Sequence, residues 1–246
     1  FLVADGMGGM EAGEVASAIA RDETVRAVGE GSSLTQAIQH AHAAIRDAVE
    51  KGIGAVGMGT TIVALRMQGL VYQVSWVGDS RAYLWDAAKG SLRRLSRDHS
   101  HVELLLASGV ITPDQAHKHP QKNLITQCLG QPNLEQLVVG DVHGTLLPGQ
   151  CIVLCSDGLN DELTDTEIAQ CLVSNQRLQS KADALLNKTL DNGANDNVTI
   201  VIVQPEVGGW RQRLLQNRSL VFAGIGVLLA LALLGCLKLL VGGMHP

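Results

Sequence analysis

The sequence predicts an α+β domain in which neighbouring strands pair and helices cover the sheets. Apolar, β-branched segments come in adjacent pairs, and the helical segments are grouped; a parallel sheet would need strict alternation of strands and helices. The chain has 246 residues, of which 46% are hydrophobic, so it can bury a large core. These values exclude a disordered, collagen-like or small disulfide-stabilised protein.

Two helices are predicted before the first pair of strands. Residues 11–29 and 34–51 both carry apolar residues at helical spacing. Ser33 and Gln36 form a capping-box pattern at the start of the second segment, because each side chain can bond the backbone of the other residue. We therefore expect two adjacent helices at the start of the domain.

Two hairpins and a short helical region are predicted next. Residues 60–67 and 70–78 are apolar strands separated by a short glycine-containing turn, and residues 81–86 and 91–96 form a second strand pair. Residues 100–123 are predicted to be helical in part, since Thr-Pro within them suits an N-cap and a first helical turn.

The second half of the domain repeats the grouping of strands and helices. Residues 151–155 and 198–203 are predicted strands, and helices are predicted near 165–174 and 178–190. The first of these helices follows Thr164, which opens a second capping-box pattern.

Charge and cysteine content narrow the classes of partner. The formal net charge is -5, and the sequence holds no stripe of lysines and arginines, so nucleic acid is not expected as a partner. A surplus of carboxylates favours a divalent cation instead. The five cysteines are scattered and odd in number, which suits reduced thiols better than a disulfide framework.

The C-terminal part predicts a membrane anchor. Residues 219–237 carry no charge and are long enough to cross most of a hydrocarbon core about 30 Å thick. We therefore expect a transmembrane helix over 219–241 and a basic linker over 205–218, a buried core helix being the less favoured alternative. Three arginines precede the apolar run and a single lysine follows it within that helix, which places the N-terminal domain in the cytoplasm of a single-pass inner-membrane protein.

The chain opens inside an apolar strand, FLVA, with no initiator methionine. This start is typical of a fragment, and we expect N-terminal strands of the domain to lie upstream of Phe1.

Aspartates stand at the ends of three apolar strands. Asp5-Gly6 follows the first strand, Asp157 follows residues 151–155, and Asp196 precedes residues 198–203. If the last two strands are antiparallel neighbours, Asp157 and Asp196 lie at the same sheet edge. Carboxylate and carbonyl oxygens are the ligands that Mg²⁺ and Mn²⁺ prefer, although a single Asp-Gly after a strand is more often an ordinary turn.

These residues belong to a longer series of motifs: VADGMGG (3–9), GTT (59–61), VGDSRAYL (77–84), LSRDHS (95–100), CSDGL (155–159) and DNVTIVIV (196–203). In these motifs and their order, the chain resembles the bacterial metal-dependent protein phosphatases of the protein phosphatase 2C (PPM) type. The resemblance covers residues 1–204. It implies an α-β-β-α sandwich of two antiparallel sheets flanked by helices, and hydrolysis of phosphoserine and phosphothreonine in proteins.

The resemblance also implies a binuclear Mn²⁺ or Mg²⁺ centre. Asp5 would bridge the two ions, the carbonyl of Gly6 would bind the second, and Asp157 and Asp196 would hold the first. Asp98 would share a third ion with Asp157. Residues 101–123 align with the mobile flap of the family, beside the active site.

The implied chemistry suits these residue types. Two ions that share a carboxylate lower the pKa of a bridging water, so that hydroxide can attack phosphorus in line without a covalent intermediate. Asp5, Asp157 and Asp196 are therefore the expected catalytic ligands, while Ser156 is expected to be a turn residue. The implied partners are phosphorylated proteins, the Ser/Thr kinases that modify them and the membrane.

The chain departs from the family pattern at three positions, and a further residue, Asp79, needs a separate role. The family's phosphate-binding arginine would lie upstream of Phe1, Met10 stands where histidine is usual, and Gln127 stands where arginine is usual. These departures leave open an alternative function, a catalytically weak, membrane-anchored phosphoprotein-binding or regulatory module. Asp79 is expected to be structural, fixing the hairpin against the Gly59–Thr61 turn.

Overall fold

The computed structural model describes residues 1–7, 10–132, 134, 136–173 and 177–205. The predicted linker from residue 206 and the predicted membrane segment at 219–241 lie outside this range. Within it, no helix has both the length and the apolar character needed to cross a bilayer.

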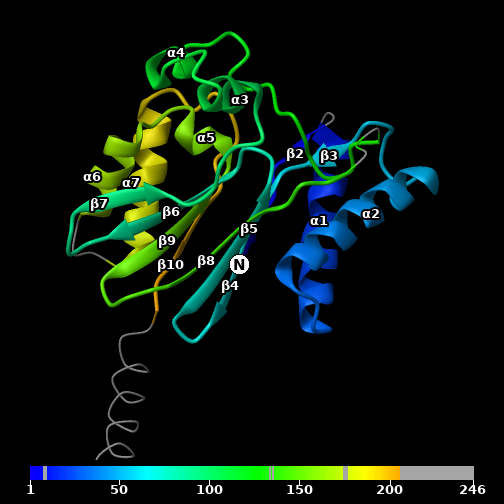
Figure 1. Cartoon of the computed structure of the whole chain (residues 1–246), viewed down its shortest axis with the longest axis horizontal. Helices are drawn as coiled ribbons and strands as arrows, with labels where there is room; N and C mark the ends of the chain where they lie inside the picture. Colours follow the sequence, from blue (N-terminus) through cyan, green and yellow to red (C-terminus); the bar gives the residue numbers. More distant parts are fainter. Residues whose placement is uncertain (8–9, 133, 135, 174–176, 206–246) are drawn as a thin grey trace, which may run out of the picture. The chain divides into compact units, whose positions relative to one another are not determined.

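Two four-stranded antiparallel sheets form the centre of the domain (Figure 1). In spatial order, the first sheet contains β1 (Leu2–Val3), β4 (Ile62–Gln68), β5 (Val71–Val77) and β8 (Gly140–Thr145). The second contains β10 (Ile200–Val203), β9 (Gln150–Cys155), β6 (Arg81–Asp86) and β7 (Ser91–Arg94). A short pair consists of β2 (Gly6–Met7) and β3 (Gly59–Thr60). Both predicted hairpins are confirmed, as β4–β5 and β6–β7.

The two sheets pack face to face because side chains alternate between the faces of their strands. On β4, Val63 and Leu65 lie in the core between the sheets, whereas Ile62 and Ala64 lie in the core beneath the N-terminal helices. The core between the sheets is completed by residues of both: Val3, Tyr72, Val74, Trp76, Ala82, Ile152, Leu154 and Val203.

Helices cover the outer face of each sheet. α1 (Met10–Gly29) and α2 (Leu34–Glu50) pack on the first sheet, and the predicted Ser33–Gln36 capping box is present. α5 (Asp157–Asn160), α6 (Asp165–Leu172) and α7 (Leu178–Asp191) lie over the second, against Val153 and Cys155 of β9. The α-β-β-α order implied by the resemblance is therefore confirmed.

The segment aligned with the flap lies at one end of the sandwich. It contains α3 (His101–Ala107) and α4 (Pro113–His117), which Figure 1 shows beyond α5 at the top of the domain. Thr112 caps α4 as predicted, with Pro113 in the first turn. No side chain of α3 is buried, although the helix carries three leucines.

Candidate active site

Asp5 is held at the end of the first sheet by the Gly59–Thr61 turn. Its backbone N–H donates to Thr61 Oγ1 (3.2 Å), and its carbonyl accepts from Thr61 N–H (2.9 Å) and from Thr60 Oγ1 (2.9 Å). Thr61 Oγ1 also shares a hydrogen bond of 2.7 Å with Ser80 Oγ. The turn therefore fixes the backbone of Asp5 while its carboxylate makes none of these bonds.

Gly6 and Gly13 must both be glycines, because β2 crosses the first turns of α1 at very short range. A Cβ on Gly6 would lie 2.0 Å from the carbonyl oxygen of Gly13, and a Cβ on Gly13 would lie 2.7 Å from the carbonyl oxygen of Gly6. Contacts this short do not occur for real Cβ atoms. The carbonyl of Gly6, a predicted metal ligand, therefore lies in a segment that can pack this closely on α1 only because residues 6 and 13 have no side chains.

Asp157 comes from the other sheet, at the point where β9 leads into α5. Ser156 joins this end of β9 to the start of β10: its N–H donates to the Thr199 carbonyl (3.1 Å), and its hydroxyl accepts from Thr199 N–H (3.0 Å) and donates to the Asn197 carbonyl (3.3 Å). β9 and β10 are antiparallel, as expected. Ser156 is the N-cap residue of α5 rather than the turn residue that was predicted, and it also holds the Asp196 loop beside Asp157.

The carboxyl groups of Asp5 and Asp157 lie close enough to act on each other's pKa, although they come from different sheets. Burial raises the pKa of both groups. The negative charge of Asp196 raises the pKa of Asp5 further, and the charges of Asp79 and Asp5 raise that of Asp157. The structure therefore brings Asp5 and Asp157 together, with the exposed Asp196 near enough to act on Asp5.

This arrangement fits a divalent cation. Asp157 Oδ1 is buried without a hydrogen-bond partner, and mutual repulsion of the carboxylates would be relieved by a positive charge between them. All of the donors are oxygens, which suits Mg²⁺ and Mn²⁺. Among the described residues, no three acidic, His or Cys side chains form a preformed metal-binding group.

Asp79 belongs to this acidic group, a role that the sequence analysis missed. Ser80, and not Asp79, bonds the Gly59–Thr61 turn, whereas Asp79 lines the same cavity as Asp98 and Asp157. Burial raises the pKa of Asp79 to about 6, and the charges of Asp98 and Asp5 raise it too. Its position directly after an apolar strand, like those of Asp5 and Asp157, was the signal that could have identified it.

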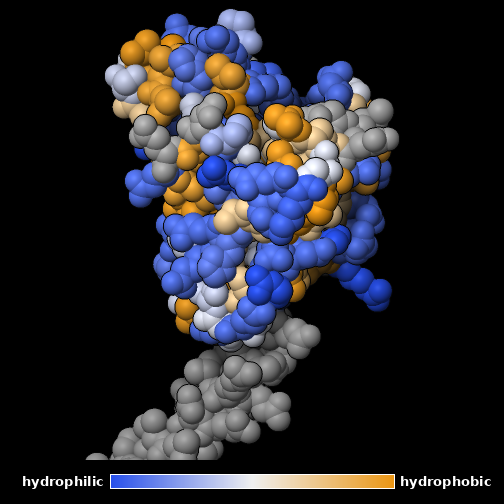
Figure 2. All heavy atoms as spheres, turned by 90° about the vertical axis from the view of Figure 1, so that its right-hand side faces the viewer, coloured by the Kyte–Doolittle hydropathy of each residue, from blue (hydrophilic) through white to orange (hydrophobic). Residues whose placement is uncertain are grey.

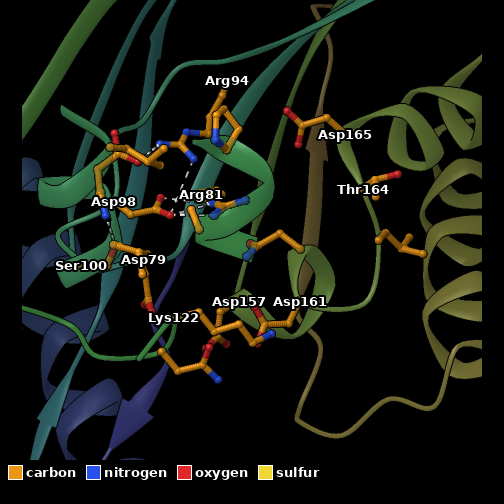
Figure 3. A pocket seen from close by; sticks show the side chains of 18 of the residues that line it. Asp79, Arg81, Arg94, Asp98, Ser100, Lys122, Asp157, Asp161, Thr164 and Asp165 are labelled. Atoms are coloured by element: carbon orange, nitrogen blue, oxygen red, sulfur yellow. Dashed lines mark hydrogen bonds and ion pairs between the residues drawn. The ribbon is translucent and has the colours of Figure 1, made fainter. Parts of the chain in front are cut away.

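Asp98, the predicted ligand of a third ion, lies in the same cavity but is already paired. Its buried carboxylate accepts from Arg81 Nε (3.0 Å) and Nη2 (2.7 Å), and Arg94 Nη1 lies 3.7 Å away. Figure 3 shows Arg81 and Asp98 joined across the cavity from Asp157. To bind an ion, Asp98 would have to loosen its contacts with Arg81.

Gln127, which replaces the family's arginine, has a structural role. Its amide nitrogen donates to the Val138 carbonyl (2.8 Å) and lies 2.8 Å from His99 Nδ1, and its amide oxygen accepts from Val138 N–H (3.1 Å). His99 Nδ1 also accepts from Gly78 N–H (3.1 Å), so this nitrogen is unprotonated. Gln127 therefore ties the loop before β8 to the start of the flap. Met10 is the first residue of α1, and its side chain lies outside the described part of the chain.

Comparison with known proteins agrees with this fold. The sequence profile of protein phosphatase 2C matches residues 1–198. The serine/threonine phosphatase stp of Listeria monocytogenes serovar 1/2a is 36% identical over 219 residues, which cover 84% of this chain and 84% of that protein. The serine/threonine protein phosphatase PstP of Mycobacterium tuberculosis H37Rv is 36% identical over 209 residues, covering 82% of this chain and 39% of PstP.

Solved structures show the same similarity. The crystal structure of M. tuberculosis PstP/Ppp superposes with a TM-score of 0.74 at 34% identity, covering 82% of this chain and 86% of that one. The catalytic domain of PstP in complex with two manganese ions gives a TM-score of 0.71 at 31% identity, covering 82% and 85%. The chain belongs to the protein phosphatase 2C family. It is a metal-dependent protein phosphatase, and its cofactor is Mn²⁺ or Mg²⁺.

Proposed function

We propose that this serine/threonine protein phosphatase hydrolyses phosphoserine and phosphothreonine in proteins at the site formed by Asp5, Asp157 and Asp196. The observation that carries the proposal is the meeting of Asp5 and Asp157 from opposite sheets, with one buried oxygen of Asp157 left without a partner. The relatives named serine/threonine phosphatases support the substrate class.

The site residues would act as ligands of two metal ions. Asp5 and the Gly6 carbonyl would hold one ion, Asp157 and Asp196 the other, and Asp5 would be shared. When bound, the two ions supply an activated water and neutralise charge on the phosphoryl oxygens. The Gly59–Thr61 turn keeps the backbone of Asp5 in place, which limits the reorganisation needed when substrate enters.

The test is phosphate release from a phosphothreonine peptide by the full chain in detergent, with Mn²⁺ and then with chelator. We expect release that stops on chelation, and loss of at least about 100-fold in kcat for Asp5→Asn and Asp157→Asn, because each removes a charged ligand. Asp191→Asn, an exposed carboxylate at the end of α7, is the matched control.

Retained turnover in the Asp5 or Asp157 variant would contradict the site assignment. If the unmodified chain released no phosphate with Mn²⁺ but still bound the phosphopeptide, the alternative function, a membrane-anchored phosphoprotein-binding module, would replace the enzyme.

We also propose that residues 219–241 anchor the domain to the cytoplasmic face of the inner membrane. It is supported by the absence of charge in residues 219–237 and by Arg211, Arg213 and Arg218 on one side of them. We expect the full chain to resist extraction from bacterial membranes at alkaline pH. Leu229→Arg with Leu231→Arg should release it, since each arginine costs about 3 kcal/mol at the centre of a span; extraction of the unmodified chain would contradict the anchor.

A further inference from the structure

A cavity of about 720 Å³ extends from the proposed catalytic site into the space between the flap and the helices of the second sheet. Asp79 and Asp157 line its catalytic end, and Thr164 and Asp165 at the start of α6 line it farther away (Figure 3). Its volume lies within the range of about 300–1,000 Å³ that is usual for ligand sites. The cavity is therefore large enough for more than a phosphate group.

Apolar side chains from the flap and from the segment before α6 also line this cavity. Val102 and Leu106 of α3 are four positions apart and so share one side of the helix, and Pro113 and Ala116 come from α4. Leu163 lies between α5 and α6 and is 1% exposed. Figure 2 shows hydrophobic side chains among hydrophilic ones at the top of the domain, where α3 and α4 lie. The flap thus contributes the apolar side chains of Val102 and Leu106, neither of which is fully buried by the described chain.

The charged side chains along the walls are mostly neutralised in pairs. The pairs are Arg81–Asp98 (2.7 Å), Arg94–Glu103 (2.7 Å) and Lys122–Asp161 (3.0 Å). Beyond the catalytic aspartates, the remaining lining charges, Lys118 and Asp165, have opposite signs. The middle of the cavity therefore has no net charge that would attract a charged side chain.

We propose that this cavity is a substrate subsite that accepts an apolar side chain close to the phosphorylated residue of the protein substrate. The proposal rests on the proposed function, because Asp157 lines both the catalytic site and this cavity. Because one cavity joins Asp157 to the flap, a substrate phosphorylated at that end can extend along it, and an extended peptide advances about 3.3 Å per residue. A leucine-sized side chain within a few residues of the phosphate would meet Val102 and Leu106 of α3.

The test uses the full chain with Mn²⁺ and a series of phosphothreonine peptides that differ only in the position of one leucine, or of aspartate in its place. We expect one position at which leucine raises kcat/KM by roughly tenfold or more over aspartate, the range typical of hydrophobic subsites. In Leu106→Asp, this leucine-to-aspartate ratio should fall towards one. The ratio does not depend on the fraction of protein that is folded, since both peptides meet the same preparation.

Leu104→Asp is the matched control. Leu104 lies on the same helix but is 59% exposed and does not line the cavity, so the ratio should remain that of the unmodified chain. Equal kcat/KM for all peptides, or an equal fall of the ratio in both variants, would overturn the subsite. Failure to hydrolyse p-nitrophenyl phosphate as well would instead count against the proposed function.

Discussion

Asp5, Asp79 and Asp157 are partly buried carboxylates that lie near one another. Without a cation to neutralise them, their negative charges lower the stability of the folded domain. Each is withdrawn from water near other negative charges, and the pKa of each is raised. Such a group binds its proton more tightly in the folded than in the unfolded state. Stability without metal therefore falls as the pH rises through the interval between the two pKa values.

Asp79 provides a measurable case at the residue scale. Its pKa rises from 3.8 to about 6, so we expect Asp79→Asn to match the unmodified protein near pH 4 and to be more stable at pH 7. The expected gain without metal is about 1–3 kcal/mol, because one pKa unit corresponds to about 1.4 kcal/mol. Urea unfolding with chelator at both pH values measures it. A gain of the same size at pH 4 would rule out this electrostatic cause, and Asp191→Asn should change neither value.

At the scale of elements, the strands that carry large apolar side chains were predicted, including the short β1 and β7, whereas β2 and β8 were not. β4, β5, β6 and β9 lie where expected because both of their faces are buried in cores. β8, with the sequence GDVHGT, was not predicted. It forms an edge of the first sheet and alternates half-buried and exposed residues, so it lacks the apolar signal.

The crossing of β2 over α1 leads to a prediction at this scale. Gly6→Ala should destabilise the domain by about 1–3 kcal/mol or more, because the added methyl would overlap the Gly13 carbonyl and force the backbones apart. Thermal unfolding compares it with Gly29→Ala, at the end of α1, where an added Cβ meets nothing within 4 Å. Equal melting temperatures for the two variants would show that β2 does not need this close approach.

At the scale of the whole molecule, each sheet contributes one carboxylate to the Asp5–Asp157 pair. Ion binding at this pair should therefore stabilise the packing of the two sheets against each other. At pH 7, we expect Mn²⁺ at 100 times its Kd to stabilise the chain by about 2.7 kcal/mol. The same Mn²⁺ concentration should stabilise it less at pH 5, where the buried carboxyls hold more of their protons. Calorimetric melting with and without Mn²⁺ measures this shift. It should disappear in Asp5→Asn; a shift that survived there would place the main ion elsewhere.

The sequence by itself determined the family, the main helices and hairpins, the capping boxes and the candidate ligands Asp5, Asp157 and Asp196. Local patterns suffice for these features, because periodicity, caps and strand-end motifs are written in consecutive residues. The tertiary structure alone showed that Asp79 joins the acidic group, that Ser80 and Gln127 are structural, and that Arg81 holds Asp98. These facts depend on contacts between residues far apart in the chain, where burial and neighbouring charge, rather than residue type, decide what a side chain does.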